Sequence, residues 1–410
     1  MTVHRLPEPE WRDRLQISSN GSIRPNLYNT CLAVRGIPAV GKSIYYDEMR
    51  GCTVVEHPLP WSNDIDRDWT DHDDSKVTEY LQGLPRTELN VGTQVAAQAV
   101  ELVAYENRRH PIREYLDGLQ WDGKRRIDGW LTYYLGADPS DLLAAQGRAW
   151  LISAVARIMN PGCQADHLLI LEGDQGLGKS SALRALCAKP EWFSDSLPPM
   201  VGGNKDAMSH LRGVWIIELA ELASMRGQVS VEAVKLFLSR RTDRYRPSYG
   251  RREADFPRQC VFSASTNLAE YLTDATGNRR FWPVQCRGID VSSITNDRDQ
   301  LWAEAAHAYR NGEAWHLVDD DIRAAASIEQ HKRMERDPWE DVVSDWIERQ
   351  TPGSGLTSRE LLDRALNLKP SDMDNAKLRR LGIVMRSLGY SPRTQKIGGR
   401  AVRSWVLPSY

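Results

Sequence analysis

The hydrophobic positions of the N-terminal third of the chain recur mainly at helical spacing. The clearest case spans residues 91–108. Its apolar side chains Val95, Ala99, Leu102 and Val103 are at helical spacing. The same spacing predicts further helices over residues 112–119, 127–135 and 142–159. We therefore expect residues 1–140 to form a mostly helical N-terminal domain.

Short apolar runs alternate with helical stretches between residues 141 and 320. Three of these runs are short enough for buried strands, and they cover residues 167–172, 213–222 and 260–267. Alternating strands and helices are typical of a parallel sheet with helices on its faces. Residues 141–320 are therefore expected to form an α/β core with three layers, αβα.

The pattern returns to helices from about Asp319. A long polar segment, 321–337, is predicted to be a linker helix. The last segment, 338–410, is predicted to contain helices over residues 339–349, 357–366 and 376–388 and a β-like end over 393–407. Three helices followed by a two-stranded wing are typical of a winged helix, which makes this segment a candidate DNA-binding domain.

Charge is distributed unevenly, although the 410-residue chain has a net charge of only −2. The last acidic residue is Asp374, and eight Lys or Arg residues follow it. This asymmetry indicates a C-terminal domain that faces nucleic acid. The candidate DNA contacts in this domain are Arg379, Arg393, Lys396 and Arg400.

The six cysteines are scattered and form no Cys-x-x-Cys motif or Cys/His cluster. We expect free thiols in a reducing compartment rather than zinc ligands or a disulfide framework. No apolar run approaches the ~20 residues needed to span a bilayer, and no signal-peptide pattern opens the chain. The sequence therefore predicts a cytoplasmic protein without a membrane partner.

One glycine-rich segment lies between the first predicted strand and a helix. Residues 173–180 fit the G-x-x-x-x-G-K-[ST] pattern of a P-loop, whose backbone N–H groups approach phosphate oxygens. Lys179 would reach the β- and γ-phosphates, and the Ser180 hydroxyl would bind Mg²⁺. ATP and Mg²⁺ are therefore the expected cofactors. The residues expected to contact the nucleotide are Gly173, Asp174, Gln175, Gly176, Leu177, Gly178, Lys179, Ser180 and Ser181.

The same pattern occurs a second time, at residues 36–43. The residues that follow it, 44–49, are β-branched and aromatic, which disfavours the start of a helix. The residues that precede it, 29–35, are better explained as a helix that ends at Gly36. We interpret this second copy as a coincidence.

A P-loop ATPase needs a carboxylate at the end of a neighbouring strand. Glu218 follows the apolar residues 214–217 and suits Mg²⁺ binding, and Glu221 would polarise the attacking water one helical turn later. The spacing leaves open which glutamate has which role, and solvated strand-end acids are the alternative. Asn267 ends the third predicted strand and is the candidate sensor 1, which orients the water beside the γ-phosphate.

Two adjacent arginines, Arg279 and Arg280, lie between a glycine turn and an apolar anchor. Such a pair suits an arginine finger, which stabilises charge on the transferring phosphate. A finger that acts in trans requires a neighbouring subunit and hence a ring. The alternative is a surface or salt-bridged pair.

Residues 239–252 are rich in arginine, and Tyr245 and Tyr249 are interleaved with the basic residues. Arginines bind phosphates and tyrosines provide surfaces on which bases stack, as in single-strand channels. The alternative is a solvated charged run. The candidate DNA contacts in this segment are Arg244, Arg246, Tyr249, Arg251 and Arg252.

Several motifs occur in order between about residues 100 and 320. They are His110-Pro-Ile-Arg113, Trp121-Asp-Gly123, Pro161-Gly-Cys163 and the segments 171–180, 215–221, 235–243 and 276–282. In these motifs the chain resembles the virulence-associated protein E (VapE-like) family of phage and prophage replication proteins. The resemblance places it with superfamily 3-type helicases in the AAA+ class of P-loop proteins.

This resemblance implies a homo-hexameric ring that couples ATP hydrolysis to movement along single-stranded or forked DNA. It implies Walker A at 173–180, Walker B at Glu218 with Glu221 beside it, and sensor 1 at Asn267. The sequence departs from the usual Walker B pattern because Glu218 is followed by Leu219 where Asp-Glu is usual. This departure leaves open which residue acts as the catalytic base.

The resemblance also implies that Arg279 or Arg280 is the finger and that residues 239–252 form the DNA element at the pore. Many relatives are joined to a primase. Here no zinc cluster is found, and Asp64 and Asp66 lie in a polar stretch without a predicted strand. A separate primase or host replication proteins would then supply priming.

Other functions use the same residues. An origin-binding replication initiator or a helicase loader would bind DNA without processive unwinding. A small-molecule P-loop kinase would leave the basic C-terminal domain without a purpose. A defence or interference role of a mobile element leaves no recognisable mark in the sequence.

Overall fold

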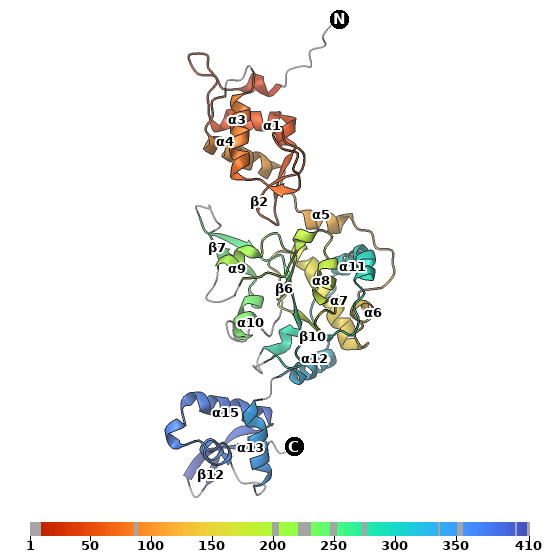
Figure 1. Ribbon diagram of the computed structural model, residues 1–410, viewed down its shortest axis with the longest axis vertical. Coiled ribbons are helices and arrows are strands. Elements are labelled where there is room, and N and C mark those ends of the chain that lie inside the picture. The colour runs from red at the N-terminus through yellow and green to blue at the C-terminus, as the bar shows by residue number, and fades with distance from the viewer. Residues whose placement is uncertain are drawn as a thin grey trace. The chain divides into compact units, whose positions relative to one another are not determined.

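The computed structural model describes residues 10–85, 89–198, 205–219, 231–246, 252–272, 277–334, 337–350, 356–397 and 400–407. The chain divides into two compact units, Met1–Arg333 and Met334–Tyr410. Figure 1 labels the helices and strands of both units, and each unit is described by itself below. Within the described ranges, no helix is both long and apolar enough to cross a bilayer.

The N-terminal part of the first unit combines helices with a small antiparallel sheet. Its helices are η1 (Glu10–Arg14), α1 (Leu27–Gly36), α2 (Pro38–Gly41), α3 (Asp71–Gln82) and α4 (Thr93–Glu106). Its strands are β1 (Ile44–Asp47), β2 (Cys52–Val55) and β3 (Arg67–Asp68), paired in that order. α1 packs against α4, which buries Val34, Ala99 and Val103. Of these elements, the sequence predicts a helix that ends at Gly36 and one over residues 91–108, although Leu102 of the latter is exposed. It does not predict α3, nor the sheet, whose strands of two to four residues are too short to show alternation.

Three helices connect this part to the central sheet. They are α5 (Pro111–Gly118), α6 (Trp130–Leu135) and α7 (Asp141–Met159). The helices predicted over 112–119 and 142–159 are confirmed, and the one predicted over 127–135 is shorter than expected. Ser140 is the N-cap of α7, and its side chain accepts a hydrogen bond from the Leu143 N–H.

A parallel five-stranded sheet forms the centre of the first unit. In spatial order its strands are β10 (Phe281–Gln285), β4 (Leu168–Glu172), β9 (Val261–Thr266), β6 (Ile216–Leu219) and β5 (Phe193–Ser194). Every residue of β4, β6 and β9 is buried, which is typical of a parallel sheet covered on both faces. The predicted α/β class with a parallel sheet is therefore confirmed.

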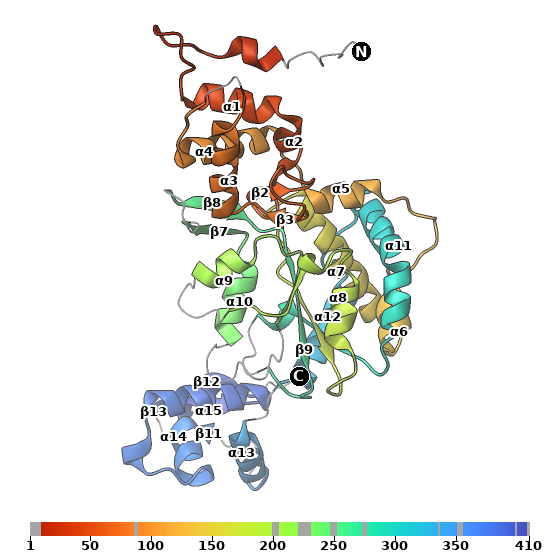
Figure 2. The ribbon, with the colours of Figure 1, turned by 45° about the horizontal axis from the view of Figure 1, so that its top comes forward.

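Helices cover both faces of this sheet. Figure 2 shows α7, α8 (Lys179–Ala185) and α11 (Val291–Arg310) on one side and α10 (Val231–Ser239) on the other. The α7 indole of Trp150 donates a hydrogen bond to the backbone oxygen of Phe262 in β9 (3.0 Å). The Phe237 ring of α10 packs edge-on against the Phe262 ring, with 5.7 Å between centroids. β9 is thus held between the two helical layers.

Two further elements lie between β5 and β9 in the sequence. They are the short helix α9 (Lys205–His210) and an antiparallel hairpin of β7 (Thr242–Tyr245) and β8 (Ala254–Pro257). A buried ion pair holds the base of the hairpin, because Arg258 Nε and Nη2 donate to the two carboxylate oxygens of Asp243 (2.6 and 2.9 Å). Both side chains are almost fully buried.

The segment predicted to be a linker helix forms α12 (Asp320–Lys332), which packs against β10 and α7. Gln330 is buried, and its Nε2 donates to the backbone oxygen of Phe281 (3.0 Å). The helix therefore belongs to the first unit, which extends to Arg333. This packing could not be predicted from the polar sequence of the helix, because the contacts rely on hydrogen bonds as much as on apolar side chains.

The second unit contains a helical part and an antiparallel sheet. Its elements are α13 (Pro338–Glu348), β11 (Leu356–Thr357), α14 (Ser358–Glu360), η5 (Leu361–Ala365), η6 (Pro370–Asp372), α15 (Asn375–Ser387), β12 (Ser391–Ile397) and β13 (Arg400–Val406). The sheet order is β11-β13-β12. Thr357 and Glu360 form a capping box at the start of α14. The core contains Val343, Leu361, Leu362, Leu381, Val384, Met385 and Trp405.

Candidate functional site

The segment predicted to be a P-loop, residues 173–180 and called the P-loop below, is folded as a tight turn between β4 and α8. Gly173 has φ +147°, a conformation that other residues rarely adopt, and an added Cβ would lie 3.0 Å from the backbone oxygen of Cys286. The Lys179 ammonium is nearly buried and donates to the backbone oxygens of Gly173 (2.7 Å) and Asp174 (2.8 Å). The lysine therefore closes the loop from within. The other predicted loop contacts Gln175 and Ser181 are exposed.

A carboxylate from a different strand meets the P-loop helix. The Ser180 hydroxyl donates to Glu218 Oε1 at 2.9 Å, and Glu218 lies in β6 with no exposed surface. The second oxygen, Oε2, is buried and has no hydrogen-bond partner among the described residues. An unsatisfied buried carboxylate oxygen is costly, and an ion or water commonly explains it. The pair offers two oxygen ligands of the kind that Mg²⁺ prefers.

No group of three or more Asp, Glu, His or Cys side chains in the described ranges is placed to hold a metal. A metal at Ser180 and Glu218 would take its remaining ligands from water and phosphate, which is how Mg²⁺ is usually held beside a nucleotide. Glu221, the second predicted acid, lies outside the described residues.

The end of β9 is hydrogen-bonded to the entry of the P-loop. The Gly173 N–H donates to the backbone oxygen of Thr266 (3.2 Å), and Asn267 follows directly. Asn267 is exposed at the same edge of the sheet as the loop. The structure thus brings Lys179, Ser180, Glu218 and Asn267 to one edge, formed by the carboxyl ends of three parallel strands.

A further charged cluster at this edge was not predicted from the sequence. Arg333 donates to both oxygens of Glu172, at 2.8 Å from Nε to Oε1 and 2.8 Å from Nη2 to Oε2. The Tyr271 hydroxyl also donates to Oε1 (2.8 Å). Burial raises the pKa of Tyr271 well above its ordinary value, so the hydroxyl keeps its proton. No sequence signal connects Glu172 with an arginine 161 residues downstream.

The two candidate finger arginines lie at the opposite edge of the sheet. They belong to η4 (Asn278–Arg280), which leads into the amino end of β10, and β10 pairs in register with β4. The P-loop follows the carboxyl end of β4. Four residue steps along a strand separate the two edges by roughly 13 Å. Arg279 and Arg280 are therefore not brought to the P-loop of the same chain.

The two arginines differ in their surroundings. Arg280 Nε donates to Asp166 Oδ2 (3.0 Å), and the Asp166 carboxylate is only 7% exposed. Arg279 is exposed, and it forms no ion pair with another described residue. Arg280 therefore has the salt-bridged role that the sequence left open, and Arg279 is free to contact another molecule.

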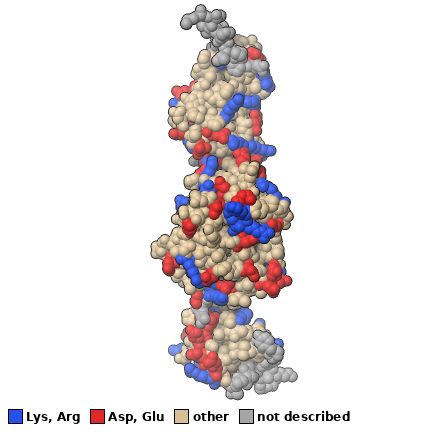
Figure 3. All heavy atoms as spheres, turned by 90° about the vertical axis from the view of Figure 1, so that its right-hand side faces the viewer, with Lys and Arg blue, Asp and Glu red and all other residues tan. Residues whose placement is uncertain are grey.

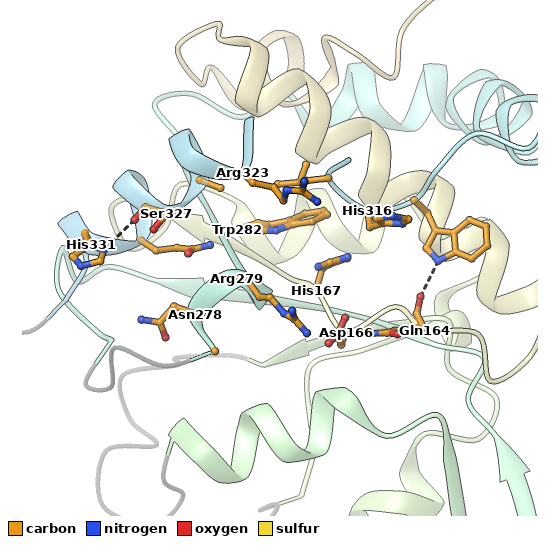
Figure 4. A pocket seen from close by; sticks show the side chains of 15 residues that line it. Gln164, Asp166, His167, Asn278, Arg279, Trp282, His316, Arg323, Ser327 and His331 are labelled. Atoms are coloured by element: carbon orange, nitrogen blue, oxygen red, sulfur yellow. Dashed lines mark hydrogen bonds between the residues drawn. The ribbon is translucent and has the colours of Figure 1, made fainter. Parts of the chain in front are cut away.

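A cavity of about 600 Å³ lies beside Arg279 (Figure 4). The His167 ring stacks on Trp282 in its wall, with 4.0 Å between ring centroids and 16° between planes. Burial lowers the pKa of His167 to about 4, so this ring is neutral at neutral pH. The exposed side chains of Arg279, His316 and Arg323 also line the cavity. The Asp166 carboxylate lines it as well, and Arg323 pairs with Asp320, so Arg279 is the lining arginine without an ion pair among the described residues.

The arginine-rich segment forms the β7–β8 hairpin, and the structure corrects part of its interpretation. Tyr245 is buried and packs against Phe256, with 4.7 Å between ring centroids, so it offers no stacking surface. Arg244 is exposed and pairs with Glu253 (3.4 Å). Arg246 and Arg252 are exposed. The predicted DNA contacts Tyr249 and Arg251 lie outside the described residues.

The basic residues of the second unit do not all gather on one element. Arg379 of α15 and Arg393 of β12 are exposed. Lys396 and Arg400 pair with Ala401 and Ile397 across the β12–β13 hairpin. Figure 3 shows both basic and acidic side chains on the described surface of one face.

The second copy of the P-loop pattern has a different structure. Residues 36–43 span the end of α1, the short helix α2 and the turn before β1. Gly41 packs against the backbone, since an added Cβ would lie 2.6 Å from the Val34 oxygen. The Ser43 hydroxyl donates to the Ala39 oxygen (3.1 Å). The expectation that no helix starts after the lysine is confirmed, because β1 follows it.

The family of the chain follows from a comparison with protein families. The profile of the virulence-associated protein E-like domain matches residues 116–335, which is more than half of the chain. The chain belongs to this family. The resemblance found in the sequence motifs is thereby confirmed, and the matched range contains every element of the edge described above.

Solved structures of the NrS-1 C-terminal region are similar to this VapE-like chain. One apo structure is 13% identical, with 94% of this chain and 100% of that chain covered and a TM-score of 0.48. A second is 12% identical, with coverages of 93% and 98% and a TM-score of 0.49. No match is found among curated proteins.

The Arg280–Asp166 contact predicts different stabilities for two arginine variants of the VapE-like chain. Arg280→Ala leaves the Asp166 carboxylate buried without its partner and should lower the free energy of unfolding by roughly 2–3 kcal/mol. Arg279→Ala should change it by no more than ~0.5 kcal/mol, because an exposed unpaired side chain contributes little. Urea unfolding monitored by tryptophan fluorescence measures both. Equal effects of the two substitutions would contradict the assignment.

Proposed function

We propose that this VapE-like protein is a ring-forming ATPase of the AAA+ class, similar to superfamily 3 helicases, that moves along or unwinds DNA. Its cofactors are ATP and Mg²⁺, its partner is single-stranded or forked DNA, and its working form is a homo-hexamer. It acts in the replication of a phage, prophage or other mobile element, with priming supplied by a separate primase or host replication proteins.

The observation that carries this proposal is the contact between Ser180 and Glu218. A P-loop serine and a strand-end carboxylate must approach the same Mg²⁺ in a P-loop ATPase. Here they already share a hydrogen bond, and the free carboxylate oxygen is the position at which a cation would be stabilised. Lys179, whose ammonium is held by loop carbonyls, would turn to the β- and γ-phosphates when ATP binds.

The strand order supports the AAA+ assignment. β9 lies between β4 and β6, so Asn267 is placed between the P-loop strand and the strand that carries Glu218. This position suits the orientation of a water beside the γ-phosphate, which is the role of sensor 1. Glu218 binds Mg²⁺ in this proposal, and Glu221 remains the candidate for polarising the water.

The distance between the P-loop and Arg279 supports a ring. Because the arginine lies at the far edge of its own sheet, it can serve an ATP site only in a neighbouring copy. Its guanidinium would then contact phosphate oxygens of the ATP that the neighbour holds. In this proposal Arg279 is the finger, and Arg280 fixes the turn that presents it.

The second unit supports a DNA-binding role and keeps one alternative open. Its helices and antiparallel hairpin have the order of a winged helix, with Arg379 and Arg393 exposed. A protein that used this unit to recognise an origin would be an initiator or helicase loader rather than a processive helicase. Both functions share the ATP site.

The two copies of the P-loop pattern provide a matched pair of substitutions. Lys179→Ala should reduce ATP hydrolysis to background and abolish unwinding of a forked DNA, because it removes the P-loop ammonium that would bind the β- and γ-phosphates. Lys42→Ala should leave both unchanged, since Lys42 is an exposed residue outside the site. Hydrolysis is measured with and without single-stranded DNA, at protein concentrations high enough for a ring to assemble.

Stimulated hydrolysis without unwinding would favour the initiator or loader. An absence of hydrolysis by the wild-type protein at high concentration would exclude a motor. Equal losses in Lys42→Ala and Lys179→Ala would show that the loss does not come from the P-loop.

The trans role of Arg279 predicts complementation between two inactive variants. Arg279→Ala should reduce the hydrolysis rate by roughly 10³-fold, and Lys179→Ala should abolish it. In a 1:1 mixture, about a quarter of the interfaces would combine an intact P-loop with an intact finger, so activity should return to a similar fraction of wild type. Arg310→Ala, which removes an exposed arginine of α11, is the control. A mixture as inactive as its components would rule out a finger in trans.

A further inference from the structure

The residue that precedes the P-loop glycine is a buried carboxylate. Glu172 ends β4, its side chain is 5% exposed, and Gly173 follows it. A carboxylate in such a place is costly unless opposite charge and hydrogen bonds compensate for lost hydration. An apolar residue would fit the buried strand at no such cost. We therefore expect the Glu172 carboxylate to have a role other than packing in the core.

Two residues from distant parts of the sequence compensate this charge. Arg333 binds both oxygens of Glu172 in a bidentate arrangement, and the Tyr271 hydroxyl donates to Oε1. Arg333 also binds Glu329 in the preceding turn of α12. The bidentate geometry fixes the direction of the Glu172 side chain as well as its charge.

Backbone hydrogen bonds join the same three segments. The N–H groups of Tyr271 and Leu272 both donate to the Arg333 backbone oxygen (3.0 Å each). The Gly173 N–H donates to Thr266, so the P-loop entry is joined to the chain segment that carries Asn267. The start of the loop, the segment after β9 and the end of α12 are therefore one hydrogen-bonded cluster.

We propose that Arg333, with Tyr271, is a positioning residue of the ATP site, an inference that rests on the proposed function. By holding Glu172 it fixes the entry of the P-loop, and by its backbone oxygen it fixes that entry relative to the segment of Asn267. Arg333 is also the last residue of the first unit.

The contact is tested without nucleotide by hydrogen exchange of the full-length protein. Arg333→Gln should increase the exchange rates of amides in residues 173–180 by roughly tenfold, because the loop entry loses charged hydrogen bonds. Lys332→Gln is the matched control, since Lys332 is exposed and also pairs with Glu329 but does not touch Glu172. It should leave exchange in the loop unchanged.

Steady-state kinetics then distinguish a positioning role of Arg333 from a direct catalytic role. Arg333→Gln should raise KM for ATP by roughly tenfold with a smaller effect on kcat, because the loop cradles phosphate in both the ground state and the transition state. Tyr271→Phe, which removes one of three hydrogen bonds, should have a smaller effect of the same kind. The double variant Glu172→Gln/Arg333→Gln should recover part of the loss, because it removes the unpaired buried charge.

The outcomes separate this proposal from the proposed function. If the wild-type protein neither binds nor hydrolyses ATP, the ATPase assignment fails, while the exchange experiment still reports on the contact. If Arg333→Gln leaves both loop exchange and KM as in wild type, Arg333 is not a positioning residue. If exchange rises equally throughout the first unit, the role is general stability, and the positioning proposal is wrong.

Discussion

The candidate site depends on a buried carboxylate of which only one oxygen accepts a hydrogen bond from a described residue. Glu218 lies in a strand with no exposed surface, and one of its oxygens is bound by the Ser180 hydroxyl while the other has no partner among the described residues. A fully satisfied carboxylate would stabilise the fold but leave no ligand for a cation. The parallel sheet makes this arrangement possible, because its strands deliver the P-loop, Glu218 and Asn267 to one edge.

The same sheet separates the arginines from the phosphate site. Since β10 and β4 are parallel and in register, residues before β10 lie at the amino edge and residues after β4 lie at the carboxyl edge. In the proposed ATPase, Arg279 could therefore reach a nucleotide only in a neighbouring copy of the chain. Within the pair, Arg280 is held by the salt bridge to Asp166, whereas Arg279 is exposed beside the cavity.

Local features of the fold and site could be predicted from the sequence, and distant pairings could not. The P-loop, its strand and its helix follow from glycine spacing and an apolar run, and the second copy was rejected from its neighbours alone. The sequence did not reveal that Tyr245 is buried, because alternation in a four-residue strand is indistinguishable from a charged loop. It also indicated a linker for α12, because the packing of this helix relies on the Gln330 hydrogen bond as much as on apolar contacts.

The Glu172–Arg333 pair shows why such contacts escape local analysis and why they matter. An ion pair 161 residues apart in sequence leaves no periodic signal, since each member alone is an ordinary polar residue near the end of an element. Buried ion pairs contribute little net stability compared with apolar replacements. They do impose one geometry, because a bidentate arginine accepts only one orientation of its carboxylate. At the entry of a P-loop, geometry matters more than stability, since phosphate binding requires several backbone N–H groups to point at one place.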